Sequence, residues 1–355
     1  MKTTILAGVA VGSMVCTVHA QSALCDAAFK SWGSGVGSSI PTDGECSSLA
    51  AGQAFVAILK ADGSLRAFGN IAAAPAGSYI AVAGGFGHAA AITVGRRVVA
   101  WGLNHRGQID VPASLPDALK VTTTYNNTAI IDMSGQVHVW GWTDQGLCNP
   151  PAGTYLEIDG GEYHLAAIDA NGTVRSWGFN DSGQTDVPQD LGPCTSVAAG
   201  GGIVGYVATG HTVAVTADGR IRCWGANGWG QSTAPATPRS ALSVAAGGPH
   251  SLALMDDGTV IAWGINTAGQ ITVPSGVANI GQVVAGEQSS FALGTCCVGD
   301  ILADRVINGA DLGALLAYWG PVTTSPISRA CDLNGDNVVN GADIGLLLAG
   351  WGNCP

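Results

Sequence analysis

The chain has 355 residues, of which 53 are glycine and only 11% are charged, and its formal net charge is −11. This acidic balance argues against nucleic-acid binding, which depends on cationic side chains that neutralise phosphates. The sequence also has no basic patch and no glycine-rich phosphate loop. Abundant glycine with little charge is typical of tight turns between buried strands and excludes a largely disordered chain.

Residues 1–20 have the pattern of a secretory signal peptide. A lysine at position 2 precedes the apolar run Ile5–Val18, and small residues end at Ala20, where a signal peptidase cleaves. The apolar run is too short and wrongly flanked to span a membrane, and no second spanning segment follows. We therefore expect cleavage near Ala20 and an exported protein (extracellular, on the cell surface or in the periplasm) with no membrane span.

A Trp-Gly dipeptide recurs along the chain at spacings of 33 to 47 residues, which is typical of repeat architectures. Thirteen residues before each pair except the first, an apolar stretch begins. The pairs start at Trp32, Phe68 (the one aromatic substitute), Trp101, Trp140, Trp177, Trp224 and Trp263, and the stretches start at Phe55, His88, Asn127, His164, His211 and His250.

Each unit predicts the same succession of strands and turns. Ser251–Leu254 and Thr259–Trp263 are too short for helices, and the Asp-Gly between them supplies the positive φ of a tight hairpin. A second turn, Asn-x-x-Gly-Gln, follows Trp-Gly and leads to Val-Pro, where the proline suits an edge strand. A Val-Ala-Ala-Gly strand then starts the next unit. Four short strands per unit predict propeller blades.

The number of units predicts a ring of seven blades. The last half-unit, Val283–Leu293, has no Trp-Gly after it, and the first Trp-Gly, at Trp32, has no half-unit before it. Joining the two completes the seventh blade from both chain ends and hides the edges that an open sheet exposes. We therefore predict a mainly β chain with a seven-bladed propeller over residues 21–295.

The unit at residues 247–270 reads Gly-x-x-His-Ser-Leu-Ala-Leu-x-x-Asp-Gly-x-Val-x-Ala-Trp-Gly-x-Asn-x-x-Gly-Gln. It resembles the repeat of the regulator of chromosome condensation family, and the resemblance covers about residues 30–293. The short unit with a Val-Pro tail is similar to bacterial members, including the secreted propeller β-lactamase inhibitor proteins. The resemblance implies the fold rather than an activity, because one propeller hosts many functions. The chromosome-binding and exchange roles of the nuclear relative are not expected in this acidic chain.

Nine cysteines remain after removal of the signal peptide, an odd number that cannot all pair within one chain. We expect disulfides rather than zinc, because the adjacent cysteines that follow the propeller lack Cys-x-x-Cys spacing or a histidine partner. The candidate bridges join Cys25 or Cys46 to Cys296 or Cys297, Cys331 to Cys354, and Cys148 to Cys194 across neighbouring blades.

Residues 296–355 form a different module. Two segments in it, 300–311 and 332–343, repeat a pattern of oxygen side chains that wraps a hard cation such as calcium, with a backbone carbonyl at the seventh position. An apolar i, i+3, i+4, i+7 stripe follows each loop and predicts a helix, and residues 321–330 contain a linker between the two units. The paired loop–helix units resemble type I dockerin domains, which attach secreted proteins to cohesin receptors.

The two calcium loops are not equal. The first has Leu302 in place of a ligand and Arg305 at the bend, which tolerates a left-handed conformation poorly. We expect calcium in the second loop and weak or no binding in the first. The doublets that dockerins use for recognition fall on Gly309-Ala310 and Gly341-Ala342, which lack hydroxyls. The expected ligands are Asp332, Asn334, Asp336, Val338, Asn340 and Asp343 in the second loop, and Asp300, Asp304, Val306, Asn308 and Asp311 in the first.

Four histidines occupy one repeat position in four different units, so we expect them to form a ring rather than a metal or acid–base cluster. Phe55, Asn127 and Ser289 hold that position in the other units, which a required ligand set would not allow. A structural role, with each histidine bonded to neighbouring turns, is therefore favoured.

Binding residues are sought where the units differ from one another. Aromatic and cationic residues outside the repeat pattern gather in the turns after Trp-Gly and in the connection before the histidine position. Trp, Tyr and Arg dominate binding hot spots, although partial burial in loop packing is an equal alternative. The candidates are Trp142, Trp229, His105, Arg106, Tyr163 and Tyr206.

Two classes of function remain. The first is a secreted, non-catalytic binding or scaffold protein, whose propeller loops bind a protein or a glycan and whose calcium-dependent tail docks to a cohesin-like receptor. The alternative is an extracellular polysaccharide lyase or hydrolase carried on a dockerin-type tail. No catalytic residue is assigned, because acidic residues lie mostly in Asp-Gly turns and no non-repeated carboxylate pair is evident. Binding is therefore favoured.

Overall fold

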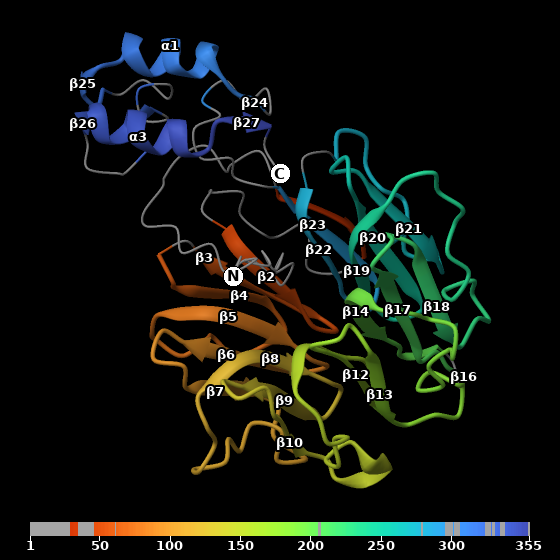
Figure 1. Ribbon diagram of the computed structural model, residues 1–355. Coiled ribbons are helices and arrows are strands. Elements are labelled where there is room, and N and C mark those ends of the chain that lie inside the picture. The colour runs from red at the N-terminus through yellow and green to blue at the C-terminus, as the bar shows by residue number, and fades with distance from the viewer. Residues whose placement is uncertain are drawn as a thin grey trace, which may run out of the picture.

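The protein is mainly β and is built from repeated three-stranded antiparallel sheets. In Figure 1 the colour passes from orange through yellow and green to blue as the chain moves from sheet to sheet, and helices α1 and α3 lie apart from the sheets. The expected signal peptide lies outside the described residues. The computed structural model describes residues 29–34, 46–60, 62–204, 207–277, 280–294, 301, 306–323, 328, 331–333 and 338–353.

Within these ranges there are seven three-stranded sheets, and each has a first strand, a central strand that starts at the histidine position, and a strand that ends in Trp-Gly or Phe-Gly. The sheets are β2 (Cys46–Ala51), β3 (Phe55–Lys60) and β4 (Leu65–Gly69); β5 (Tyr79–Gly84), β6 (His88–Thr93) and β7 (Val98–Gly102); β8 (Ala118–Thr123), β9 (Asn127–Asp132) and β10 (Val137–Gly141); β11 (Tyr155–Gly160), β12 (His164–Asp169) and β13 (Val174–Gly178); β14 (Cys194–Gly200), β17 (His211–Thr216) and β18 (Ile221–Gly225); β19 (Ala241–Ala246), β20 (His250–Met255) and β21 (Val260–Gly264); and β22 (Ile280–Ala285), β23 (Ser289–Gly294) and β1 (Phe29–Gly33).

The last of these sheets joins the two ends of the propeller sequence. β1 pairs with β23 in the register Gly33 opposite Ser289, and the hairpin of β20 and β21 has the same register, with His250 opposite Gly264. Gln282 of β22 also exchanges hydrogen bonds of 3.3 Å with both backbone groups of Leu49 in β2. The first strand of the last sheet therefore lies beside the first strand of the first sheet.

The prediction of a fourth strand in each unit is wrong for the described residues. The Val-Pro segments are turns: Leu115 N donates to Pro112 O over 3.0 Å, and Leu191 N donates to Pro188 O over 3.1 Å. Proline has no N–H for a ladder, and its carbonyl is used within the turn. The sheets therefore have three strands rather than four.

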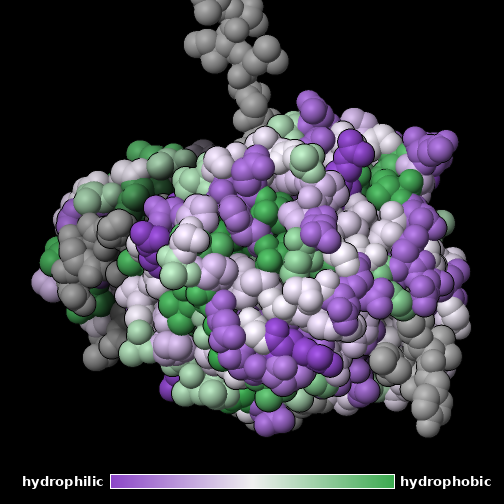
Figure 2. Space-filling view, turned by 90° about the horizontal axis from the view of Figure 1, so that it is seen from below, coloured by the Kyte–Doolittle hydropathy of each residue, from purple (hydrophilic) through white to green (hydrophobic). Residues whose placement is uncertain are grey.

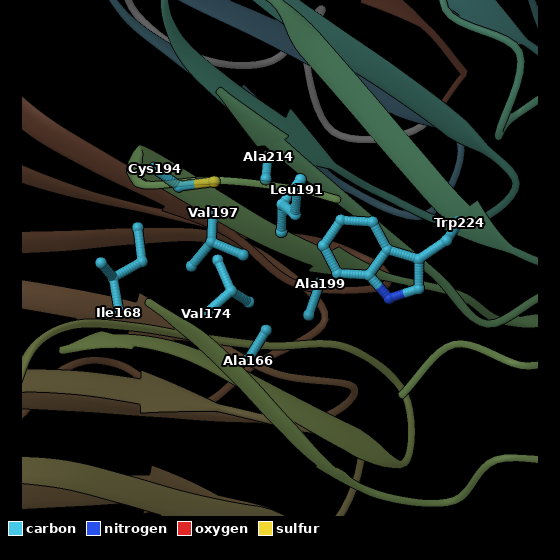
Figure 3. Packing of buried hydrophobic residues seen from close by; sticks show 9 residues of the cluster. All are labelled: Ala166, Ile168, Val174, Leu191, Cys194, Val197, Ala199, Ala214 and Trp224. Atoms are coloured by element: carbon cyan, nitrogen blue, oxygen red, sulfur yellow. The ribbon is translucent and has the colours of Figure 1, made fainter. Parts of the chain in front are cut away.

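The hydrophobic core lies between neighbouring sheets. Figure 3 shows one such cluster, in which Ile168 and Val174 of one sheet face Val197 of the next, with Trp224 beside them. Central strands such as β20 are buried along all six residues. Burial on both faces explains why these strands are continuous apolar runs rather than alternating ones.

The C-terminal module has two helices that repeat one another, α1 (Gly309–Ala317) and α3 (Gly341–Ala349). The short strand before each helix pairs with the strand after the other helix: β24 (Val306–Ile307) with β27 (Gly352–Asn353), and β25 (Gly320–Pro321) with β26 (Val338–Val339). Leu315, Leu347, Ile307 and Val339 form its buried core. The start of the expected linker belongs to this module, because Pro321 is in β25.

One expected disulfide is wrong. Cys148 and Cys194 are both free: the Cys148 thiol lies 3.5 Å from the carbonyl of Trp142, and the Cys194 thiol lies 3.7 Å from the carbonyl of Gly192. The two thiols therefore have separate local partners. Cys46, Cys223 and Cys331 are also free, and the remaining cysteines of the expected bridges, Cys25, Cys296, Cys297 and Cys354, lie outside the described residues.

Candidate functional site

A cavity of about 260 Å³ lies where the first strands of the sheets end. We call it the axial cavity, because all seven sheets contribute to it. In each sheet the residue at the same place beyond the first strand faces the cavity, and we call these seven the mouth residues. They are Gln53, Phe86, Tyr125, Glu162, Gly201, Gly248 and Glu287.

Glycines let the sheets converge on this cavity. A Cβ on Gly247 would lie 2.0 Å from the carbonyl oxygen of Gly286, and one on Gly85 would lie 2.5 Å from that of Thr124. Neighbouring connections are also joined by backbone hydrogen bonds, such as Tyr125 N to Glu162 O at 3.0 Å. The glycine of Gly-x-x-His is therefore required by the close approach of two backbones.

Two mouth residues are carboxylates whose pKa values are raised. Glu162 is 6% exposed, and its Oε1 has no hydrogen-bond partner among the described residues. Burial, with the charge of Glu287, raises the pKa of Glu162 to about 7, although a hydrogen bond from Tyr163 opposes the rise. Burial also raises the pKa of Glu287, and a hydrogen bond from Gln53 opposes it. Both carboxylates are therefore harder to ionise than an exposed glutamate, because the cavity solvates negative charge poorly.

An aromatic row runs outward from the cavity. The rings of Phe86 and Tyr125 are stacked at 3.7 Å between centroids, and Tyr125 lies 5.4 Å from Tyr163. Tyr163 then meets Trp142 edge-on at 5.3 Å and Phe179 at 6.2 Å. These five rings come from the connections and turns of three neighbouring sheets, so the row crosses the boundaries between them.

The structure brings together three of the six binding residues expected from the sequence. Trp142 contacts Tyr163, and the guanidinium of Arg106 lies 5.7 Å over the Trp142 ring. His105 lies beside Gln108 at 3.5 Å, and Trp229 is 43% exposed without a described ring contact. Tyr206 lies outside the described residues. Four mouth residues were not predicted from the sequence: Gln53, Phe86, Glu162 and Glu287. Each directly follows the glycine of Gly-x-x-His or its equivalent, and the variation of this position among the units could have indicated it as a binding position.

The four histidines lie buried in four different sheets, and the Nε2 of each contacts a hydroxyl of the next sheet; His211 Nδ1 also lies 3.2 Å from the carbonyl of Thr209 in the preceding connection. His164 Nε2 lies 2.9 Å from the Thr212 hydroxyl, which donates to the carbonyl of Gln184 over 2.8 Å. Burial lowers the pKa of His164 to about 3, so the ring is neutral at neutral pH. The equivalent contacts are His88 to Thr128, His211 to Ser251 and His250 to Ser290, at 2.9 to 3.1 Å.

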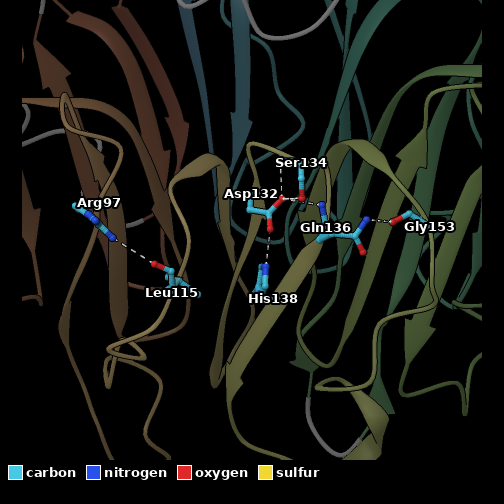
Figure 4. A network of polar contacts seen from close by, with 7 residues as sticks. All are labelled: Arg97, Leu115, Asp132, Ser134, Gln136, His138 and Gly153. Atoms are coloured by element: carbon cyan, nitrogen blue, oxygen red, sulfur yellow. Dashed lines mark hydrogen bonds and ion pairs between the residues drawn. The ribbon is translucent and has the colours of Figure 1, made fainter.

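Asp132 is the centre of a polar network on the hairpin of β9 and β10 (Figure 4). One of its carboxylate oxygens accepts hydrogen bonds from Ser134 and from Gln136 N, and the other lies 2.8 Å from His138 Nε2. Burial alone would raise the pKa of Asp132, but these hydrogen bonds lower it to about 2. Asp132 is therefore an ionised turn residue that fixes the hairpin.

The expected calcium ligands are described only in part. Asp343 is fully buried, and its carboxylate accepts hydrogen bonds from Leu333 N at 2.7 Å and Asn340 N at 2.8 Å. Asp311 accepts from Asn308 N at 3.0 Å in the first loop, so the two helices begin alike. Asp332, Val306 and Val338 are also described, whereas Asn334, Asp336, Asp300 and Asp304 lie outside.

Exposed hydrophobic residues are few on the face seen in Figure 2, where they lie in small groups among hydrophilic ones. The C-terminal module differs: Leu316 and Trp319 after the first loop, and Leu348 and Trp351 after the second, are each about half exposed. They occupy equivalent positions in the two loop–helix units. None of the helices in the described part of the chain has the length and apolar character needed to cross a membrane.

The sequence pattern of the regulator of chromosome condensation (RCC1) repeat matches residues 79–108, 157–184, 209–231 and 242–270. Each matched segment contains a histidine position, a Trp-Gly pair and the glutamine of the following turn. No curated protein matches the chain.

Three solved structures show the same fold. Yeast RCC1 (Prp20) in complex with Kap60 has a TM-score of 0.63 and 16% identity, covering 83% of this chain and 97% of that one. Human WBSCR16 has a TM-score of 0.58 and 15% identity, covering 71% and 87%. The CRINKLY WD40 ectodomain of the Arabidopsis thaliana receptor kinase ACR4 has 0.55 and 18%, covering 69% and 91%. The repeat matches and the shared fold together identify this part of the chain as an RCC1-like repeat propeller.

Proposed function

We propose that the chain is a protein-binding scaffold whose partner docks on the face around the axial cavity. The observation that carries this proposal is Glu162, a buried carboxylate with an unpartnered oxygen in a cavity beside an aromatic row. Such a group is costly to bury unless a ligand satisfies it. The yeast structural neighbour Prp20p is described as binding Gsp1p and histones, so a propeller of this kind can serve protein recognition.

The docking test uses the full secreted chain as bait and compares variants of the aromatic row. Trp142→Ala and Tyr163→Ala should each reduce capture of a crosslinked protein partner at least tenfold, because aromatic anchors dominate interface energies. Trp229→Ala is the matched control, since Trp229 is exposed and outside the row. Loss of capture with Trp229→Ala and full capture with Trp142→Ala would contradict the proposed face.

We further infer that the seven sheets close into one seven-bladed propeller of the short, secreted bacterial type, over residues 21–295. The pairing of β1 with β23 and the hydrogen bonds between Gln282 and Leu49 support this closure. The signal-peptide pattern of residues 1–20 supports export. N-terminal sequencing of the mature protein after secretion tests it, and a mature chain that retains residues 1–20 would overturn it.

We propose that the C-terminal module is a calcium-dependent docking tail. The donor set fits calcium, because Asp332, Asp343 and the Val338 carbonyl supply hard oxygens at positions 1, 12 and 7 of the second loop. The half-exposed Leu and Trp side chains of both units offer an apolar surface to a cohesin-like receptor. Asp332→Ala should abolish the calcium-induced rise in the melting temperature of the tail and leave the propeller transition unchanged.

An extracellular polysaccharide lyase or hydrolase is the second candidate. Glu162 and Glu287 share one cavity, and this is a non-repeated carboxylate pair that the sequence did not reveal. The cavity, at about 260 Å³, is below the usual range of about 300–1,000 Å³ for small-molecule sites. It therefore suits one side chain better than an oligosaccharide. Release of reducing sugar from polysaccharides that Glu162→Gln abolishes would establish the enzyme instead.

A further inference from the structure

We propose that the axial cavity receives the guanidinium group of an arginine side chain, an inference that rests on the protein-binding function proposed above. Three features of the cavity favour this occupant over other groups: two carboxylates, a stacked aromatic pair and a stretch of glycines that leaves room beside the carboxylates. All three come from mouth residues and their immediate neighbours.

The carboxylates of Glu162 and Glu287 favour a positively charged occupant. Glu162 is 6% exposed and its Oε1 has no partner among the residues described. Glu287 leans toward the same space, because its Oε1 would lie 3.6 Å from a Cβ placed on Gly202, another cavity residue. A buried carboxylate is stable when it is paired with a cation and hydrogen-bonded. The net charge of −11 adds a long-range attraction for a basic partner.

The aromatic pair distinguishes a guanidinium from an ammonium or a metal ion. Phe86 and Tyr125 are mouth residues on one side of Glu162 and stack on one another with ring planes 21° apart. A planar guanidinium stacks on such rings and binds carboxylates through two parallel N–H groups, whereas an ammonium is a point charge. The chain makes the same kind of contact itself, where Arg106 lies over Trp142.

The other side of Glu162 is lined by glycines. Gly201, Gly202 and Gly248 line the cavity there, between Glu162 and Glu287 in the order of the mouth residues. These glycines have no side chains to fill the space beside Glu162, although the amide and carbonyl of Gly202 are both bonded to Thr209. The planar guanidinium can therefore lie between Glu162 and Glu287 without a clash on this side of the cavity.

The experiment titrates the full chain with acetyl-Gly-Arg-Gly-amide at pH 8, where Glu162 is ionised, and follows binding by NMR. The matched probes are the citrulline peptide, which is isosteric but neutral, and the lysine peptide. We expect the arginine peptide to bind at least tenfold more tightly than the citrulline peptide and more tightly than the lysine peptide. Equal binding of all three, or competition by calcium rather than by free guanidinium, would overturn the proposal.

Variants place the binding in the cavity. Glu162→Gln and Glu287→Gln should each weaken arginine-peptide binding about tenfold. Glu157→Gln should not, because Glu157 pairs with Lys120 at 2.8 Å outside the cavity. Phe86→Leu should remove the preference for arginine over lysine while the variant still folds, as shown by its unfolding temperature. Unchanged binding in Glu162→Gln would contradict the inference.

The two proposals fail in different ways. A protein partner that is captured through Trp142 and Tyr163 but is not displaced by the arginine peptide would overturn the guanidinium site and leave the scaffold function standing. Glu162-dependent binding of the arginine peptide without any captured protein would support the site and overturn the scaffold function.

Discussion

Trp263 donates its indole N–H to the backbone carbonyl of Gln231 over 2.9 Å, and so ties one sheet to the turn that follows the preceding sheet. The same carbonyl accepts a hydrogen bond of 3.3 Å from the Ser251 hydroxyl, and His211 of the preceding sheet lies 2.9 Å from that hydroxyl. A histidine, a hydroxyl and a tryptophan therefore link neighbouring sheets through one carbonyl. The repeated His-Ser or His-Thr, Trp-Gly and Gly-Gln elements are parts of this single connection.

Replacing Trp263 with phenylalanine tests the connection. Trp263→Phe should lower the free energy of unfolding by about 1 kcal/mol more than Trp140→Phe does. Both changes remove similar packing, but Trp140 Nε1 has no hydrogen-bond partner among the described residues. Urea unfolding of the two variants measures the difference. Equal losses would show that the Gln231 bond adds nothing to stability.

The four buried histidines at the repeat position should make the stability of the propeller sensitive to acid. Burial lowers the pKa of His250 to about 3 and that of His211 to about 4, from an ordinary value of 6.5. Below pH 6.5 the unfolded chain therefore binds protons that the folded chain does not, so stability falls as pH decreases from about 6.5 to about 3.

His250→Asn isolates this effect, because Asn127 occupies the same position naturally. The variant should lose stability less steeply than the parent over that pH range, by the slope that corresponds to one proton. Thermal unfolding at a series of pH values measures both slopes. Parallel curves would mean that the His250 ring is protonated in the folded state as readily as in the unfolded one.

Glu162 should have the opposite pH dependence. Its pKa is about 7 in the fold against 4.5 ordinarily, so stability falls as pH rises from about 4.5 to about 7 and is constant above. Glu162→Gln removes this loss and should be more stable than the parent at pH 8, by about 3 kcal/mol at most. The two proteins should converge at pH 4. A variant that is less stable at pH 8 would show that the carboxylate is already compensated in the free protein.

Gly247→Ala should destabilise the propeller by about 3 kcal/mol, because its Cβ would overlap the Gly286 carbonyl oxygen. Neither backbone is free to move without displacing a first strand. Gly228→Ala is the control, since nothing lies within 4 Å of a Cβ at that exposed position. Chemical denaturation distinguishes the two substitutions, and tolerance of alanine at 247 would contradict the close approach of β19 and β22.

Sequence alone was sufficient for the strands that carry the repeat. The constant 13-residue spacing fixes the register of His250 opposite Gly264, and the same spacing applied across the chain ends predicts Ser289 opposite Gly33. The prediction of a strand at Val-Pro was wrong, because the tolerance of proline at a sheet edge does not provide a strand for it to pair with. The turn hydrogen bond from Leu115 N to Pro112 O takes its place.

The site was predicted only at its rim. Trp142 and Arg106 interrupt the repeat and could be found by comparing units. Glu162 and Glu287 could not be paired, because each is one ordinary acidic residue in a different unit. Only the convergence of first strands places them in one cavity. Their protonation depends on burial, which no local spacing encodes.

The pairing of β1 with β23 also sets an order for synthesis. β1 leaves the ribosome before every other strand, yet its partner is the last strand of the propeller to be made. Throughout translation its hydrogen-bonding groups and Trp32 have no ladder to join, so the nascent chain carries an open strand until nearly all of it exists. An interrupted product that stops before residue 280 lacks both β22 and β23 and retains that open strand, which would recruit other chains. In the proposed seven-bladed ring, closure therefore waits for the last strands to be made, and a chain that stops before residue 280 cannot achieve it.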